Sequence, residues 1–279
     1  MCRLFGFRSA VLSRAHRSLV TAQNALADQA REHPHGWGIG YFQSGDAYVL
    51  KSEGAAADST SFRRAADRLA SNALVAHVRR ATVGEVGPLN THPFRHGRWL
   101  FAHNGTIHGF SQIEAAMRQG TPDSIWQERL GDTDSEAFFA LLLGAFQARG
   151  VDVNGHDAAD VATVTDAVQA TIASVTAWAA AGGHEAPVLN FVLTNGREFF
   201  AQRWRRELHF STQKIFCRDS GTCPEREKPC LLAVRPPGRV NHLLVASERI
   251  GDEEQWEEVG EHELLAVDAE FHFHRAMVA

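Results

Sequence analysis

The order of secondary-structure elements along the sequence predicts an α+β fold built largely from antiparallel strands. Strand-like segments come first, two long helical segments follow in the middle of the chain, and strand-like segments return towards the C-terminus. Helices grouped in this way can pack together on one face of an antiparallel arrangement. The 279 residues contain no internal repeat, low-complexity tract or obvious linker, and they are enough to bury a full core. We therefore predict a single domain over residues 1–279.

The N-terminal part of the chain is predicted to alternate between strands and helices. Weak alternation of apolar residues indicates a first strand, a His-Pro-His-Gly turn leads into a second, and Ser44-Gly45-Asp46 is a hairpin signal. The expected strands are 3–9, 37–42, 47–51 and 73–78, and the expected helices are 18–30 and the basic, amphipathic 60–71.

The rest of the chain contains the strongest local signals. Thr133 and Glu136 form a capping box, with Thr133 as N-cap and Glu136 at the third helical position, ahead of an apolar run at 138–146. Asn195-Gly196 is the dipeptide most typical of a tight hairpin. The other expected helices are 110–119 and 158–181, and the other expected strands are 99–102, 189–193, 198–204, 241–247 and 264–268.

The composition argues against several classes of protein. Hydrophobic residues make up 44% and charged residues 22%, which is ordinary for a globular protein. A net charge of −5 argues against a nucleic-acid partner, because such proteins normally carry a basic surface. No apolar run approaches the roughly 18 residues of a membrane span, and the apolar core of a signal peptide is interrupted by Arg3, Arg8, Arg14 and Arg17. We therefore expect a cytoplasmic protein without a membrane partner.

Three of the four cysteines lie close together in a polar, proline-containing segment. Cys217, Cys223 and Cys230 are separated by five and six residues, which differs from the C-x₂₋₄-C spacing of common zinc sites. Free thiols in a loop, a local disulfide, and a zinc site completed by His209 or His242 are the three interpretations. We expect free thiols and neither a metal nor a cofactor.

Cys2 stands directly after the initiator methionine. A small residue at this position permits removal of Met1, which would leave Cys2 as the N-terminus. Its α-amine, with an ordinary pKa of about 7.7–8.0, would then lie beside its own thiol. One residue would supply both a nucleophile and a base able to take its proton, directly or through a water. The alternative, from position alone, is a chance small residue.

Four polar clusters follow at the ends of predicted elements, where binding groups commonly lie. Arg79 could bind a carboxylate through two parallel N–H hydrogen bonds, and Asp134 could bind an ammonium group. Asn104 offers an amide donor and Gly105 a backbone N–H, as an oxyanion hole requires. The structural alternatives are a surface ion pair for the arginine, helix capping for the aspartate, and a plain Asn-Gly turn. His92, in the remaining cluster, is at least as well explained by a structural hydrogen bond as by catalysis.

In combination, six segments resemble the class II glutamine amidotransferases, which belong to the N-terminal-nucleophile (Ntn) hydrolase superfamily. Their order and approximate spacing agree with that family across residues 1–145. The second and fourth segments, with residues 244–248 and 256–259, are most similar to the stand-alone YafJ-like branch, which is related to γ-glutamyl hydrolases of ergothioneine synthesis and glutathione breakdown. The six segments are Met1-Cys2-Arg3-Leu4-Phe5-Gly6, His35-Gly36-Trp37-Gly38-Ile39-Gly40, His77-Val78-Arg79-Arg80-Ala81-Thr82, Asn90-Thr91-His92-Pro93-Phe94, His103-Asn104-Gly105 and Thr133-Asp134-Ser135-Glu136.

The resemblance implies a four-layer αββα sandwich in which Cys2 lies at the end of an inner strand. The motifs would lie within residues 2–145, and residues 146–279 would complete the sandwich. Cys2 would be the nucleophile and its α-amine the base, while Asn104 and Gly105 would be the oxyanion donors.

The resemblance also implies which residues hold the substrate. Arg79, with Thr82 nearby, would bind the α-carboxylate of a glutamyl group, and Asp134 would bind its α-ammonium group. The implied reaction forms a γ-glutamyl thioester, releases ammonia or an amine, and ends in hydrolysis to glutamate. Larger members of the family carry a tryptophan where this chain has Arg80 and a polar residue near the position of Val83, so the departures concern the leaving-group side.

The main functional prediction is therefore hydrolysis of a small-molecule substrate, either glutamine or another γ-glutamyl amide. No P-loop or Rossmann signature follows residue 145, so the chain either hydrolyses its substrate outright or supplies ammonia to a separate partner protein. The alternatives are a non-catalytic, glutamine-binding regulatory subunit in which Met1 stays in place, and a zinc protein. The sequence leaves the leaving group open.

Overall fold

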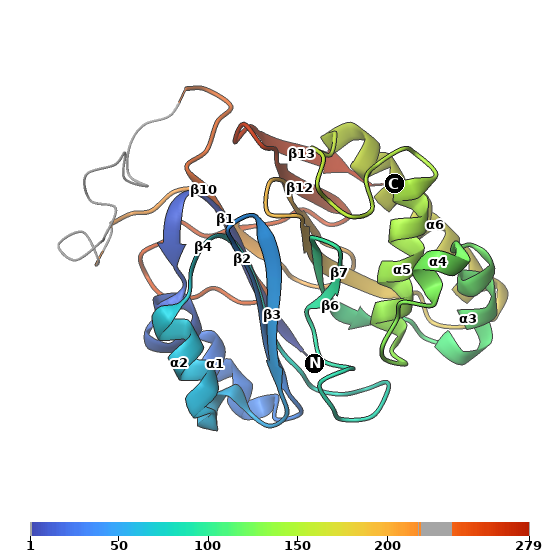
Figure 1. The fold of residues 1–279 in the computed structure, drawn as a ribbon, viewed down its shortest axis with the longest axis horizontal. Helices are drawn as coiled ribbons and strands as arrows, with labels where there is room; N and C mark the ends of the chain where they lie inside the picture. Colours follow the sequence, from blue (N-terminus) through green and yellow to red (C-terminus); the bar gives the residue numbers. More distant parts are fainter. Residues whose placement is uncertain (1, 217, 219–235, 279) are drawn as a thin grey trace.

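The computed structural model describes residues 2–216, 218 and 236–278, and within them two antiparallel sheets face each other (Figure 1). The first sheet contains β1 (Arg3–Arg14), β2 (Trp37–Gln43), β3 (Asp46–Ser52), β4 (Ala70–Val78), β9 (His209–Ser211), β10 (His242–Ala246) and β11 (Glu257–Glu258). The second contains β5 (Phe94–His96), β6 (Trp99–Thr106), β7 (Val188–Thr194), β8 (Phe199–Gln202), β12 (Glu263–Val267) and β13 (Phe273–Met277). Their spatial orders are β11-β9-β10-β1-β4-β2-β3 and β13-β12-β8-β7-β6-β5. The predicted antiparallel arrangement is confirmed.

Helices cover the outer faces of both sheets, on opposite sides of the molecule (Figure 1). The first sheet carries α1 (Leu26–Gln29) and α2 (Thr60–Arg68), together with short π- or 3₁₀-helical turns at Arg17–Thr21, Ala30–Glu32 and Ala56–Asp58. The second carries α3 (Phe110–Gln119), α4 (Asp123–Trp126), α5 (Asp134–Gln147) and α6 (Val161–Ala181). In the described part of the chain, no helix has the length and apolar character needed to cross a membrane.

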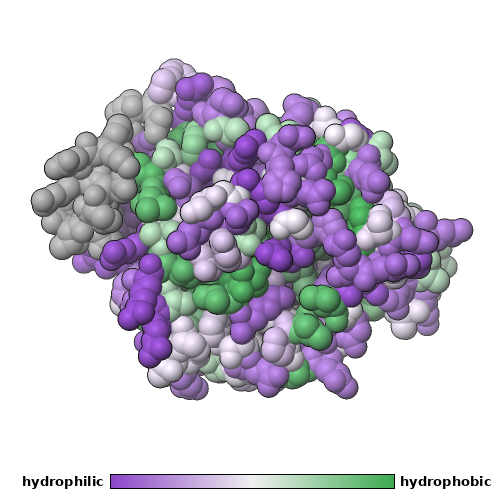
Figure 2. All heavy atoms as spheres, in the orientation of Figure 1, coloured by the Kyte–Doolittle hydropathy of each residue, from purple (hydrophilic) through white to green (hydrophobic). Residues whose placement is uncertain are grey.

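Three apolar clusters fill the spaces between these layers. Trp37 and Phe62 pack edge to face between the first sheet and α2, with ring centroids 5.2 Å apart. Leu4 belongs to the cluster between the two sheets. Phe101 and Phe138 meet between the second sheet and α5, with centroids 6.0 Å apart. The layers therefore run α, β, β, α, and the expected four-layer sandwich is confirmed. Its surface is mostly hydrophilic on the face of Figure 2, with hydrophobic residues in separate groups.

The helix predicted over residues 18–30 is wrong in its continuity. The segment forms three short helical pieces, and Asn24 between them has a φ of 56°, in the left-handed region. The Asn24 amide donates to Glu248 Oε2 over 3.1 Å and to the Arg249 carbonyl over 2.9 Å. A contact with a distant part of the chain therefore interrupts the local helical pattern. The helix predicted over 60–71 likewise stops at Arg68, because β4 begins two residues later.

The strand predicted over 99–102 is longer than expected. It continues to Thr106 and pairs with β7, with Asn104 opposite Asn190 and Gly105 opposite Leu189. The Asn-Gly turn considered from the sequence is therefore wrong, since both residues belong to a paired strand. The pairing with β7 overrides the local turn preference of this dipeptide.

The capping box at the start of α5 is only half formed. Thr133 is the N-cap as predicted, and its Oγ1 accepts the Glu136 N–H over 3.2 Å. The Glu136 carboxylate accepts the N–H groups of Leu130 and Gly131 over 3.0 and 2.7 Å, so it orders the loop before the helix. This loop lies beside the candidate site described below.

Two glycines of the His-Gly-Trp-Gly segment permit a close approach between β2 and the loop before β5. A Cβ atom on Gly38 would come within 3.0 Å of the His92 carbonyl oxygen, a separation that real Cβ atoms essentially never show. Gly36 has a φ of 145°, and a Cβ there would meet the Thr91 side chain. Because neither position carries a side chain, the loop can pack directly against the sheet.

We expect Gly38→Ala to lower the free energy of unfolding by about 1–3 kcal/mol, the usual cost of forcing a methyl group into a filled space. Gly87→Ala is the matched control, because an added Cβ there meets no atom within 4 Å. Urea denaturation of the two variants measures the difference. Equal midpoints for Gly38→Ala and the unaltered protein would contradict the close-approach explanation.

Candidate active site

Cys2 lies immediately before β1, beside the end of β4, where Arg3 pairs with Val78. Its Sγ accepts the Arg80 backbone N–H over 3.3 Å and lies 3.5 Å from the Arg80 carbonyl oxygen. Side chains alternate along a strand, so Cys2 faces the same side as Leu4, towards the space between the sheets. In Figure 1 the N-terminus accordingly lies between the two helical sides of the molecule.

Burial raises the pKa of the Cys2 thiol above its ordinary value, and the negative charge of Asp134 adds to the rise. The Arg80 N–H and the positive charge of Arg79 lower this pKa but are outweighed. The thiol is therefore mostly protonated at neutral pH, and a nucleophilic role requires a base. The opposed effects of Arg79 and Asp134 on one sulfur indicate that the predicted cation and anion lie near it.

Asn104 reaches from β6 towards the first sheet. Its Nδ2 donates to Ser247 Oγ over 3.1 Å, and the same oxygen accepts the Leu4 N–H over 3.0 Å. Ser247, which follows β10, thus joins the strand that begins after Cys2 to the strand that carries Asn104. An amide nitrogen has two hydrogens, so one remains for a developing oxyanion. The sequence patterns assign no role to Ser247. Its sequence indication is its place in the 244–248 segment, which is similar to the YafJ-like branch.

Gly105 is required by packing. A Cβ atom there would come within 3.0 Å of the Val188 carbonyl oxygen and of the His103 ring. His103 Nε2 lies 2.9 Å from that same carbonyl, so the ring and the neighbouring strand occupy the space beside the glycine. The backbone of Gly105 is half-exposed and lies next to Asn104 in the strand.

Arg79 is only 3% exposed, so the surface ion pair considered from the sequence is wrong. Its Nη1 donates to the Glu85 carbonyl over 2.8 Å, and its Nη2 donates to the carbonyls of Val83 and Gly84 over 2.9 and 3.4 Å. A guanidinium has five N–H groups, so two remain after these three bonds. Thr82 lies exposed at the start of the same loop.

Asp134 is buried at the first position of α5. Its Oδ2 accepts the Ile107 N–H and its Oδ1 accepts the Ser135 N–H, both over 2.8 Å. The carboxylate thereby ties the end of β6 to the start of α5, a role beyond simple helix capping. Because a carboxylate offers about four lone-pair sites, it can accept further hydrogen bonds from a ligand.

Three buried histidines lie behind these groups. The ring centroids of His77 and His92 are 4.3 Å apart, and those of His92 and His103 are 6.5 Å apart. Burial lowers the pKa of all three rings, with neighbouring positive charges adding to the effect; that of His77 falls to about 3. The rings are therefore neutral near pH 7. A pKa this far below neutrality makes His92 a poor general base, which favours its structural interpretation.

Residues 1–271 match the family model of the class II glutamine amidotransferases. The chain belongs to this family. It is 33% identical over 132 residues to the putative glutamine amidotransferase YafJ of Escherichia coli, a match that covers 46% of this chain and 48% of that protein. It is 30% identical over 172 residues to the γ-glutamyl-hercynylcysteine sulfoxide hydrolase of Mycolicibacterium smegmatis, which covers 58% of this chain and 69% of that protein.

A solved structure shares the fold. A class II glutamine aminotransferase domain protein from Silicibacter pomeroyi superposes with a TM-score of 0.63 over 99% of both chains, at 16% identity. The expected family and its YafJ-like branch are confirmed. The matches span about half the length of several curated relatives, 48% of YafJ and 55% of a Methanocaldococcus jannaschii protein.

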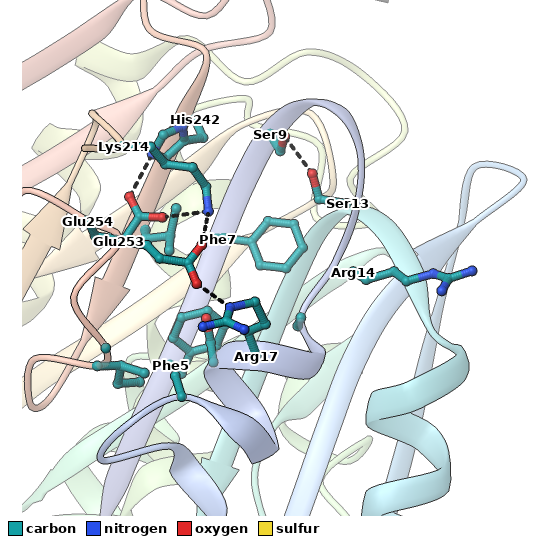
Figure 3. Close-up of a pocket in the computed structure, with 16 residues that line it drawn as sticks. Phe5, Phe7, Ser9, Ser13, Arg14, Arg17, Lys214, His242, Glu253 and Glu254 are labelled. Atoms are coloured by element: carbon teal, nitrogen blue, oxygen red, sulfur yellow. Dashed lines mark hydrogen bonds and ion pairs between the residues drawn. The ribbon is translucent and has the colours of Figure 1, made fainter. Parts of the chain in front are cut away.

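A pocket lies on the outer side of β1, lined partly by Phe5 and by two buried carboxylates (Figure 3). Glu253 forms an ion pair with Arg17, and Glu254 lies 3.0 Å from Lys214 Nζ and 3.1 Å from His242 Nε2. Burial alone would raise the pKa of Glu254, but its bonds to His242 and Lys214 lower it. These ion pairs satisfy the carboxylates, and strand alternation puts the pocket on the opposite side of the sheet from Cys2.

One group of possible metal ligands occurs in the described ranges. Asp268, Glu270 and His272 bring ligand atoms within 4.8 Å of one another between β12 and β13. Asp268 Oδ2 lies 3.0 Å from both His272 Nδ1 and His274 Nε2, so its hydrogen bonds account for the cluster without an ion. The three cysteines considered for zinc or a disulfide lie outside the described part of the chain: Cys217, Cys223 and Cys230.

The buried histidines predict that the protein loses stability between about pH 7 and pH 5.5. Their pKa values are lowered in the folded state, so below about pH 6.5 the unfolded chain binds protons that the folded protein does not. His77 and His92, whose pKa values fall furthest, should each remove about 1 kcal/mol of unfolding free energy over this interval. Urea denaturation at the two pH values measures the loss.

His92→Gln should reduce this pH dependence, whereas His156→Gln, at an exposed position, should leave it unchanged. A free energy of unfolding that is equal at both pH values would contradict the lowered pKa values.

Proposed function

We propose that the chain hydrolyses the γ-amide bond of glutamine or of a γ-glutamyl compound. The observation that carries the proposal is a thiol beside one buried cation, Arg79, and one buried anion, Asp134, in a class II amidotransferase fold. The head of an amino acid has one carboxylate and one ammonium group, so the two residues match it in number and sign. The name of the mycobacterial relative, a γ-glutamyl hydrolase, supports the same bond class.

In this proposal both charged groups of the glutamyl head are bound by the protein. Arg79 binds the α-carboxylate through the N–H groups that the 83–85 carbonyls do not use, and Asp134 accepts the α-ammonium group. Thr82 lines the same side of the substrate. Charge-assisted bonds of this kind are about twice as strong as neutral ones. With the head held, the γ-carbonyl carbon is presented to Cys2 without a further search.

The chemical step requires Cys2 to be the N-terminal residue after Met1 has been removed. Burial raises the pKa of the thiol, so the free α-amine, with an ordinary pKa of about 7.7–8.0, takes its proton. The sulfur attacks the γ-carbonyl carbon, and the negative charge on the carbonyl oxygen is stabilised by Asn104 Nδ2 and the Gly105 N–H. The C–N bond then breaks as the α-ammonium returns the proton to the leaving amine. Water hydrolyses the thioester to glutamate and restores the thiol.

We further propose that residues 1–279 act as one domain, because strands after residue 145 contribute to both sheets. The ammonia or amine is released, or is passed to a separate acceptor protein. A glutamine-binding regulatory subunit would instead retain Met1. The intact mass of protein from its native host separates these cases, since retained Met1 contradicts the α-amine as base.

Cys2→Ala should abolish the release of glutamate from glutamine and γ-glutamyl amides, because the covalent step needs the thiol. Alanine is also small enough for Met1 to be removed, so the variant keeps a free α-amine. A coupled glutamate assay measures turnover. Hydroxylamine should trap the acyl group of the unaltered protein as the γ-glutamyl hydroxamate.

Cys217→Ser is the control, because it removes a different cysteine and should retain activity. Hydroxamate formation by Cys2→Ala at the normal rate would refute Cys2 as the nucleophile.

Arg79→Gln should raise the KM for glutamine by roughly 10-fold or more, the effect of losing a charge-assisted hydrogen bond. For 4-aminobutyramide, which is glutamine without its α-carboxylate, the kcat/KM should be similar in the variant and the unaltered protein. Steady-state kinetics with both amides measure the effect, and thermal unfolding confirms that the 83–85 loop tolerates the change. Arg64→Gln, on the exposed side of α2, is the matched control. An equal loss with both amides would count against carboxylate binding by Arg79.

A further inference from the structure

A second arginine, Arg206, lies on the loop that follows β8, and the side chain of Asn190 fixes its backbone. Asn190 Nδ2 donates to the Arg206 carbonyl over 2.8 Å, and Asn190 Oδ1 accepts the Arg206 N–H over 3.3 Å. Asn190 is fully buried on β7, and its Oδ1 also accepts the Trp204 N–H over 2.8 Å. The position of this loop is therefore set by a buried side chain.

The register of β6 and β7 brings this loop to the candidate site. Asn190 stands directly opposite Asn104, and opposed residues of an antiparallel pair project from the same face. Asn190 is two residues before Val192 on β7, and Val192 belongs to the cluster between the sheets. Because side chains alternate along a strand, Asn190 and the opposed Asn104 face the same layer as Cys2. The loop carrying Arg206 is thus anchored beside the side chain proposed to stabilise the oxyanion.

The Arg206 side chain is half-buried, and no described acidic side chain forms an ion pair with it. Among the residues that the structure describes, it forms no ion pair and no side-chain hydrogen bond, whereas Arg79 donates three. Burial lowers the pKa of Arg206, and the charge that Cys2 carries when it ionises acts against this effect. Arg206 is therefore a cation without an ion pair in the described part of the chain, and it lies within electrostatic reach of Cys2.

Arg79 and Arg206 approach Cys2 from different elements. Arg79 follows β4 and feels the charges of Cys2, Asp132 and Asp134, whereas Arg206 follows β8 and feels those of Cys2 and Arg3. With the glutamyl head on Arg79 and Asp134, Arg206 is left for the other end of the substrate. That end is the leaving amine, because it lies beyond the γ-carbonyl.

We propose that Arg206 binds an anionic group on the leaving amine, so that the preferred substrates are γ-glutamyl amides whose amine carries a carboxylate, as in γ-glutamyl amino acids and peptides. This inference rests on the proposed hydrolase function and adds a substrate class to it. A guanidinium suits the role because its planar fork matches a carboxylate with two parallel N–H bonds. Glutamine itself, which releases ammonia, makes no use of this cation.

The test compares γ-glutamylglycine with γ-glutamylmethylamide, which differ only by the carboxylate on the leaving amine. The unaltered protein should have a kcat/KM about 10-fold or more higher for γ-glutamylglycine. Arg206→Gln should remove that preference, lowering kcat/KM for γ-glutamylglycine by the same factor and leaving the methylamide within about two-fold. Arg205→Gln, at the exposed neighbouring position, is the control and should change neither value.

Equal losses on both amides in Arg206→Gln would overturn the inference, since they would indicate a general effect on the loop. An unchanged preference would overturn it as well. Calorimetric binding of γ-glutamylglycine to Cys2→Ala, with and without Arg206→Gln, gives a second reading that needs no turnover and should show the same loss in affinity. Absence of hydrolysis of both amides by the unaltered protein would count against the proposed function, while this binding comparison would still decide the role of Arg206.

Discussion

The hydroxyl of Ser247 accepts one hydrogen bond from each sheet, and the geometry of the candidate site depends on these two bonds. One donor is the backbone of Leu4, two residues after Cys2, and the other is the amide of Asn104 on the opposing sheet. The Ser247 N–H also donates to the Leu4 carbonyl over 3.0 Å. The thiol and the amide come from different sheets, so their separation depends on how the sheets are joined. A buried bond of this kind is costly to leave unmade, which makes the junction rigid.

Around this junction, neutral buried side chains and charged side chains occupy different positions. Burial raises the pKa of the Cys2 thiol and lowers those of His77 and His92, so the thiol keeps its proton and both rings are neutral near pH 7. Two guanidinium groups lie near these neutral side chains: Arg79 is bonded to loop carbonyls, and Arg206 has no ion pair or side-chain hydrogen bond among the described residues. A low-dielectric environment strengthens the interaction of such charges with a substrate. Removal of Met1 would then supply the missing base within the proposed mechanism.

The fold was predictable where neighbours in sequence decide the structure. The helix at 110–119 and the hairpin at Asn195-Gly196 agree with the sequence prediction, because apolar spacing and turn propensity are local properties. The helix predicted over 18–30 failed because Asn24 bonds to residues 248–249, which no local pattern reports. The Asn-Gly pair at 104–105 failed as a turn for the same reason, since pairing with β7 holds it extended.

The sequence by itself determined the class of protein and a short set of chemically suitable groups, because Cys2, Arg79 and Asp134 occur in motifs that can be read along the chain. It did not reveal Ser247 or Arg206. Both lie far from Cys2 in sequence, and the pairing of β1 with β10 and of β6 with β7 brings them to the candidate site. Tertiary structure decided their positions because a hydrogen bond between distant strands depends on register and sheet packing. Local residue preferences specify neither.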